Sequence, residues 1–194
     1  MRAKRPQGAT PSHLRAFSLL ELLIVIVAIS LLLLVAIDRL LALRFEAERV
    51  TVQSVIGALR SGLYVEFAAA AAGGQLARLD AARGSNPMLR LAERPDSYAG
   101  EFFGADPALF EPGTWYFDTR ERALVYLVRF PEQFVTPLSG PPRARLTVEP
   151  DYDDLDRNGR FDPGRDPVRG LRLVPLERFY WKGAPGQESG GKKE

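Results

Sequence analysis

The side chains best suited to do chemistry in this chain are the carboxylates of an acidic stretch near its C-terminal end. From residue 154 the sequence reads DLDRNGRFD, so oxygen-bearing side chains recur at alternate positions and a glycine permits a sharp turn. Such oxygens can converge on one hard cation, and calcium prefers carboxylate, amide and carbonyl oxygens. The predicted calcium ligands are Asp154, Asp156, Asn158, Arg160 through its backbone carbonyl, Asp162 and Asp166.

This stretch otherwise follows an EF-hand loop but departs from it at the closing position. That position, a bidentate Glu in EF-hands, is Arg165 here, and we expect Asp166 to close the site instead. Prolines at 150, 163 and 167 argue against flanking helices. A solvated acidic turn is the alternative, because Asn, Asp and Gly are common in turns for backbone reasons alone. Any calcium held here would be structural and not catalytic.

The composition excludes several catalytic classes. The chain of 194 residues has no cysteine and a single histidine, His13, so thiol nucleophiles, disulfides and His-dependent triads are excluded. The net charge is +2, but Arg2, Lys4, Arg5 and Arg15 precede residue 17, and without them the balance is slightly negative. The overall charge therefore points to no particular partner.

An apolar segment follows the basic N-terminal stretch. Leu22–Ile37 carries no charged residue, and with residues 17–20 it is long enough to span a bilayer, which takes about 20 apolar residues. The preceding basic residues predict a cytoplasmic N-terminus. A secretory signal peptide is the rival interpretation, but no small-residue cleavage site follows the apolar run. Glu21 is costly in lipid unless it is paired, which makes it a candidate functional residue.

The stretch Arg15–Ile29 (RAFSLLELLIVIVAI) closely resembles the class III signal of type IV prepilins and type II secretion pseudopilins. In that family a small residue precedes the cleaved bond, Phe follows it, and Glu is fifth in the mature chain. Here those positions are Ala16, Phe17 and Glu21. The family usually has Gly before the cut, and many pilins have Pro where this chain has Asp38.

The resemblance implies that a prepilin peptidase cuts between Ala16 and Phe17 and methylates the new amine of Phe17. It implies that Glu21 pairs with the Phe17 amine of a neighbouring pilin or pseudopilin subunit. It also implies a single-pass protein of the inner membrane, with its C-terminal domain in the periplasm and the inner-membrane assembly platform as a partner. Secretion pseudopilins hold calcium in their C-terminal region, which favours the calcium interpretation of the acidic stretch.

A helix is predicted to continue beyond the membrane as far as Gly73 and Gly74. Its apolar residues recur at helical spacing along one stripe: Leu41, Phe45, Val52, Ile56, Leu59, Leu63 and Phe67. Charged residues such as Glu48 lie mostly off this stripe. The predicted organisation is a basic leader at 1–16, a long helix at 17–72 (transmembrane at 17–38, amphipathic at 39–72), a periplasmic domain at 73–182 and a disordered tail at 183–194.

The domain after the helix is predicted to contain several short strands. They are Thr114–Asp118, Ala123–Phe130, Arg143–Glu149 and Leu171–Trp181, the first two forming a hairpin around 119–122. The hairpin aromatics are expected in the core. Residues 75–112 show few clear strands and a short helix near Gln75–Ala82. This order predicts an α+β, pilin-like fold in which one long N-terminal helix packs on a small antiparallel β-sheet.

The predicted function is that of a structural and assembly subunit, a minor pilin or pseudopilin. The alternative is a pilus-presented adhesin or DNA-binding minor pilin, suggested by Arg143, Arg145, Arg157, Arg160, Arg165, Arg169 and Arg172. Acids are interleaved among these arginines, and phosphate binding needs a net positive surface, so nucleic-acid binding is not expected. A membrane-anchored enzyme is a third class, for which the sequence shows no catalytic motif.

Overall fold

The computed structural model describes residues 18–159, 161–162 and 165–182. The predicted leader, the Ala16–Phe17 bond, Arg160 and the tail at 183–194 lie outside these described residues. The chain forms two compact units, one ending at Leu43 and one beginning at Arg44, and each is described by itself. Both contain part of helix α1, which is Leu19–Ala72.

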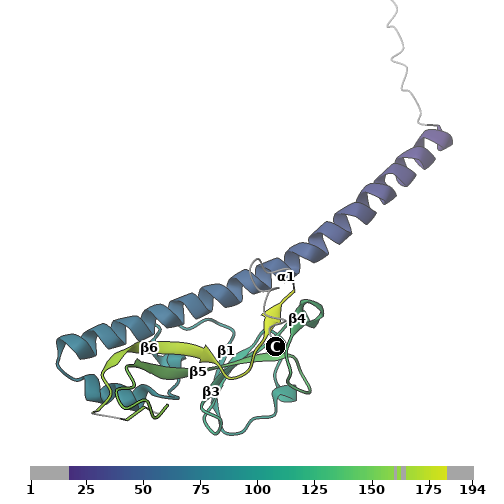
Figure 1. Ribbon diagram of the computed structural model, residues 1–194. Helices are drawn as coiled ribbons and strands as arrows, with labels where there is room; N and C mark the ends of the chain where they lie inside the picture. The colour runs from purple at the N-terminus through teal and green to yellow at the C-terminus, as the bar shows by residue number, and fades with distance from the viewer. Residues whose placement is uncertain (1–17, 160, 163–164, 183–194) are drawn as a thin grey trace, which may run out of the picture. The chain divides into compact units, whose positions relative to one another are not determined.

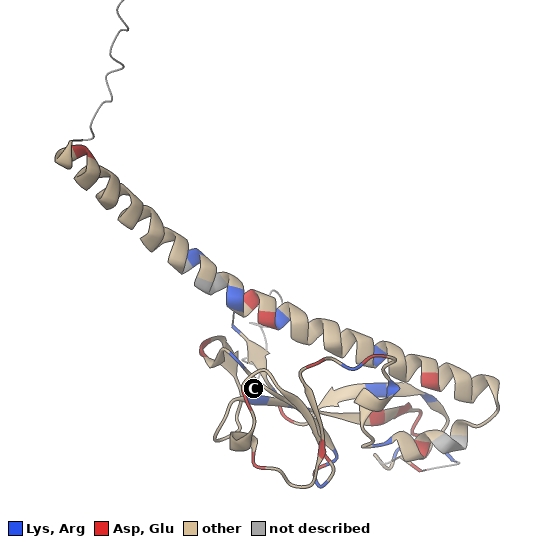
Figure 2. Ribbon diagram, turned by 180° about the vertical axis from the view of Figure 1, so that it is seen from behind, with Lys and Arg blue, Asp and Glu red and all other residues tan. Residues whose placement is uncertain are grey.

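The first unit, in its described part, is the apolar beginning of α1. Leu19–Ile37 has a mean hydropathy of 3.1, is long and apolar enough to cross a membrane, and is not buried against any other part of the structure. Figure 2 shows almost no charged residue along it. The expected N-terminal apolar helix is thus confirmed. By length and composition it suits either a membrane anchor or a signal sequence.

The second unit is an α+β domain in which the later part of α1 lies along a five-stranded sheet (Figure 1). The predicted apolar stripe faces this sheet, because Val52, Leu59 and Leu63 are buried and Ile56 packs against the same core. They meet Met88, Trp115, Phe117, Leu124, Tyr126, Leu146, Val148 and Leu173. Leu43–Ala72 is also apolar enough to cross a membrane, but its stripe forms one side of this core.

The main sheet is mixed, with the strand order β1-β2-β3-β5-β6. Its strands are β1 (Tyr98–Phe102), β2 (Trp115–Asp118), β3 (Ala123–Leu127), β5 (Arg143–Tyr152) and β6 (Val168–Pro175). β1 pairs with β2 in parallel, and the other neighbours are antiparallel. The prediction of an antiparallel sheet is therefore wrong for β1. The β1–β2 connection has about a dozen residues, as the return path of a parallel pair requires.

The remaining elements are short. β4 (Phe134–Val135) and β7 (Tyr180–Trp181) form a separate two-stranded antiparallel sheet, so the predicted strand at 171–181 is divided between two sheets. The helix expected near Gln75–Ala82 is a 3-10 helix, η1 (Leu76–Ala82). Three further 3-10 turns are η2 (Pro87–Arg90), η3 (Pro107–Leu109) and η4 (Pro131–Gln133). Sequence patterning misses β1, because Ala99 and Gly100 interrupt its larger residues.

Both faces of the central hairpin are covered. Side chains alternate along its strands, so Trp115 and Tyr126 face the core beneath α1 while Tyr116 and Val125 face the other side. On that other side Phe110, from the β1–β2 connection, stacks on Tyr116 with 4.3 Å between ring centroids. The hairpin aromatics are therefore core residues, as predicted.

A buried carboxylate, Glu48, fastens α1 to the end of β3. Its Oε1 accepts hydrogen bonds from the Tyr126 hydroxyl at 2.7 Å and from the Arg129 backbone N–H at 2.6 Å. Its Oε2 accepts the Phe130 N–H at 3.0 Å. Although the sequence places Glu48 off the apolar stripe, only 8% of the residue is exposed. The three donors explain why an acid is tolerated there.

Replacing Glu48 should destabilise the domain strongly. In Glu48→Ala the Tyr126 hydroxyl and two backbone N–H groups lose their acceptor, and each buried unsatisfied donor costs about 1–3 kcal/mol. Urea unfolding of the full chain in detergent micelles would measure the loss. Glu46→Ala is the matched control, since Glu46 is exposed on the same helix and should leave stability nearly unchanged. Equal stability of the two variants would contradict this role of Glu48.

The buried phenols predict a loss of stability at alkaline pH. Burial raises the pKa of Tyr116 to about 12, above its ordinary value of 10.0. A phenol with a raised pKa in the folded state stabilises the fold fully below its unfolded pKa and loses that contribution as pH rises through the folded pKa. Tyr116→Phe should therefore lose less stability than the native chain between about pH 10 and 12. Parallel curves of unfolding free energy against pH would contradict this.

Candidate functional site

The first turn of α1 places Glu21 at the head of the apolar helix. The Ser18 hydroxyl accepts a hydrogen bond from the Glu21 backbone N–H at 3.1 Å. The Leu22 N–H donates to the Ser18 carbonyl at 3.1 Å, which begins the helical ladder. A Ser followed three residues later by Glu is the sequence of a capping box, and an acid in the first turn interacts favourably with the helix dipole.

The Ser18 side chain therefore caps the helix, and Glu21 contributes its backbone N–H and the favourable charge of an acid in the first turn. Sequence reasoning overlooks this cap although the Ser-x-x-Glu pattern is readable. The cap requires neither lipid nor a neighbouring subunit. The predicted partner of Glu21 is the amine of Phe17, which lies outside the described residues together with Ala16. The processing and assembly roles of Ala16, Phe17 and Glu21 thus stay predictions.

Large apolar side chains surround the helix beyond Glu21 and are exposed. As far as Ile37, their exposed fractions range from 40% at Val25 to 71% at Leu32. Ser30, the polar residue of this stretch, donates its hydroxyl to the Ile26 carbonyl at 2.8 Å, so its donor is satisfied within the helix. An apolar surface of this kind calls for a cover of lipid or of other apolar helices.

The acidic stretch forms the loop between β5 and β6. The Asp154 carboxylate accepts the backbone N–H groups of Asn158 at 3.2 Å and Gly159 at 2.7 Å. The latter hydrogen bond lowers the pKa of Asp154, because it stabilises the charged carboxylate. The Asn158 side-chain amide donates to Asp156 at 3.1 Å and to Asp162 at 2.8 Å. Four of the predicted ligands are thus brought together by the loop.

Asp166 joins the two ends of the loop. Its carboxylate is buried and accepts the backbone N–H of Leu155 at 3.2 Å and that of Asp162 at 2.9 Å. Arg165, at the position of the missing Glu, pairs with Asp156 at 3.3 Å. Asp166 therefore acts on the loop backbone here, a role that its place in the sequence does not reveal.

Whether these oxygens can bind calcium depends on the groups that already form hydrogen bonds with them. N–H groups satisfy the carboxylates, and in the described ranges no group of three or more His, Cys, Asp or Glu side chains is placed to hold a metal ion. Binding would require Asn158 to present its amide oxygen, in place of its nitrogen, to Asp156 and Asp162. Arg160, the expected carbonyl ligand, lies outside the described residues. Calcium binding stays a prediction.

Several of the late arginines are paired with acids. The pairs are Arg145 with Glu121 and Glu177, Arg165 with Asp156, Arg169 with Asp153 and Arg172 with Asp151. The Arg143 guanidinium instead donates to the carbonyls of Ser139 and Pro141. This pairing leaves a mixed-charge surface, whereas binding to a nucleic-acid backbone is dominated by unpaired cations.

Comparisons of this chain with protein-family models, with curated proteins and with solved structures gave no match. A functional assignment therefore rests on the residues of the chain itself. The features available for it are Glu21 with the exposed apolar helix that follows, and the acidic loop between β5 and β6.

If the loop binds calcium, added calcium should raise the melting temperature of the full chain in detergent. Extracellular sites bind calcium with dissociation constants of about 10⁻⁴ to 10⁻³ M, so roughly 10 mM calcium should raise the melting temperature by about 3–8 °C. A chelator should reverse the shift, and the double variant Asp154→Asn/Asp156→Asn should abolish it.

Asp96→Asn, an exposed acid outside the loop, is the control and should keep the calcium response. A native chain whose melting temperature does not change with calcium would leave the acidic turn as the correct interpretation.

Proposed function

We propose that the chain is a structural and assembly subunit, a minor pilin or pseudopilin, of a type IV pilus or a type II secretion pseudopilus. The observation that carries the proposal is Glu21, a single acid at the head of an exposed apolar helix and the fifth residue after Ala16. Before assembly, Leu19–Ile37 anchors the chain in the inner membrane, with the second unit in the periplasm. The fold is then pilin-like, with α1 as its stem.

Processing follows from the same residues. A prepilin peptidase cuts between Ala16 and Phe17, removes the basic residues and methylates the new amine of Phe17. In the filament, helices of neighbouring subunits replace lipid around the apolar segment, and this amine pairs with Glu21 of a neighbour. Removing one partner of such a buried pair leaves the other charge unpaired, at a cost of about 3–5 kcal/mol.

The partners in this proposal are the peptidase, other pilin or pseudopilin subunits and the inner-membrane assembly platform. A pilus-presented adhesin or DNA-binding minor pilin is the alternative. The pairing of Arg145, Arg169 and Arg172 with acids favours the structural role over nucleic-acid binding. We propose no catalytic activity for the subunit.

The variant Glu21→Gln should be processed but lost from filaments. Glutamine also serves at this position of a capping box, so the start of the helix is preserved while the charge is removed. The unpaired amine of Phe17 should then reduce incorporation by at least roughly tenfold relative to the amount in the membrane. Immunoblots of sheared filaments and of membranes from the same cells measure this ratio.

The matched control is Ser18→Ala, which removes the helix cap and keeps the charge of Glu21. Its incorporation should stay close to that of the native chain. Incorporation of Glu21→Gln at the native level, or an equal loss in both variants, would contradict the pairing and leave Glu21 as an acid in the first turn of the helix only.

A further inference from the structure

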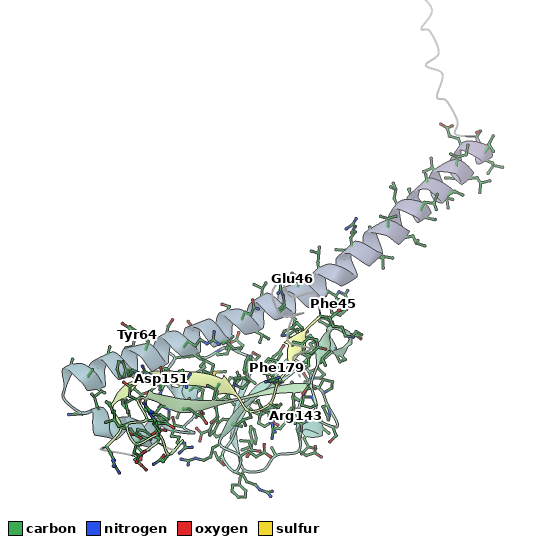
Figure 3. All side chains as sticks on the ribbon, viewed as in Figure 1. Phe45, Glu46, Tyr64, Arg143, Asp151 and Phe179 are labelled. Carbon is green, nitrogen blue, oxygen red and sulfur yellow. The ribbon has the colours of Figure 1, made fainter. Side chains whose placement is uncertain are left out.

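An aromatic contact lies at the start of the second unit, and positively charged residues lie near it in the chain. The ring of Phe45, on α1, meets the ring of Phe130 edge to face, with 5.4 Å between centroids. Both side chains are half-buried, and Figure 3 labels Phe45 near the start of this unit. Phe side chains are among the apolar groups that interfacial segments bury at the boundary between lipid headgroups and acyl chains.

Three exposed cations flank this contact. Arg44 precedes Phe45 and Arg129 precedes Phe130 in the chain, while the Lys182 ammonium donates to the Glu132 carbonyl at 3.0 Å. The Arg129 side chain donates only to a backbone carbonyl, that of Pro112, and within the described part of the chain none of the three cations forms a salt bridge. We name Arg44, Phe45, Arg129, Phe130 and Lys182 the Phe130 patch.

The acids near the patch offset only part of its charge at the surface. Glu48 lies beneath it, buried, and uses both carboxylate oxygens to accept the Arg129 and Phe130 N–H groups and the Tyr126 hydroxyl. Glu132 is exposed, so its carboxylate offsets one of the three positive charges, while the exposed Glu46 beside Phe45 is paired with Arg49. The late arginines, by contrast, are largely matched with acids. The Phe130 patch therefore has unpaired cations next to partly exposed rings.

The chain itself keeps this patch close to the apolar helix. Only residues 38–43 lie between Ile37, the end of the apolar stretch, and Arg44. Fully extended, that segment spans at most about 25 Å, so this limit holds however the two units are arranged. If Leu19–Ile37 is anchored in a bilayer, the patch is held near its surface.

We propose that the Phe130 patch docks on the anionic headgroups of the bilayer that holds Leu19–Ile37. This inference rests on the membrane anchoring of the proposed function and adds a lipid-binding surface to it. Arg44, Arg129 and Lys182 contact lipid phosphates, while the rings lie at the headgroup level. Each cation near an anionic surface should shift the ratio of docked to undocked domain by about fivefold.

Energy transfer between the domain and the lipid headgroups tests the proposal. The chain has no cysteine, so Gln133→Cys, next to the patch, gives a single site for a donor dye, with acceptor dye on the headgroups. Full-length chain is placed in nanodiscs of phosphatidylcholine, with or without phosphatidylglycerol. We expect higher transfer with the anionic lipid, and a fall towards the neutral-lipid value in about 1 M salt, where screening is strong.

The triple variant Arg44→Gln/Arg129→Gln/Lys182→Gln should remove the dependence on anionic lipid. A matched triple variant of exposed arginines elsewhere, Arg60→Gln/Arg94→Gln/Arg120→Gln, should keep it. A dye at Leu109→Cys, on an exposed residue of η3, serves as the reference position. Thermal melts compare the folding of the variants. The salt response of the chain with its patch unmutated tests the docking without any charge substitution.

The outcomes separate this inference from the proposed function. If the chain stays in the nanodiscs but transfers energy equally in both lipids, the docking proposal alone is overturned. The same holds if the triple variant of the patch keeps the dependence on anionic lipid. Chain that does not remain with the nanodiscs overturns the membrane anchor and the docking proposal together.

Discussion

The domain depends on holding one face of α1 against the sheet, and Glu48 fixes where that contact begins. Apolar packing alone is non-directional, so the burial of Val52, Leu59 and Leu63 could tolerate some sliding of the helix along the strands. The hydrogen bonds from the Tyr126 hydroxyl and two backbone N–H groups to Glu48 have defined directions and lengths. They fix the helix at one position relative to β3 and to the segment that follows it.

The same helix presents two kinds of surface along its length. As far as Ile37 it is apolar all round and exposed, whereas from Arg44 it is amphipathic and buries one stripe. A helix that is apolar all round is stable only inside a protein core or a membrane. In this setting Glu21 is informative, because an acid in an apolar environment must find a partner. The filament proposal names that partner as the Phe17 amine of a neighbouring subunit.

Much of the fold follows from local patterns in the sequence. The apolar spacing of Val52, Leu59 and Leu63 predicts the buried stripe, and the aromatic run at 115–117 predicts a core hairpin; both are confirmed. These features are readable because periodicity reflects burial directly. Features that depend on contacts distant in the sequence are not readable. β1 is parallel to β2 only because the intervening segment returns across the sheet.

The site shows the same limit. Glu48 looks like a solvent-facing acid until its three donors, some eighty residues away, are placed around it. The Ser18 cap is local and readable, and it uses the backbone N–H of Glu21 and not the carboxylate on which the assembly role depends. The acidic spacing at 154–162 predicts that these side chains gather, which they do, but it does not reveal that N–H groups satisfy them.

The most direct test of the central claim is the intact mass of the chain after co-expression with a prepilin peptidase and extraction from the membrane. The account predicts the loss of residues 1–16 and the gain of one methyl group on Phe17. An uncut chain, or one cut after the apolar run, would contradict it and leave an anchored or secreted α+β domain in which Glu21 only starts the helix.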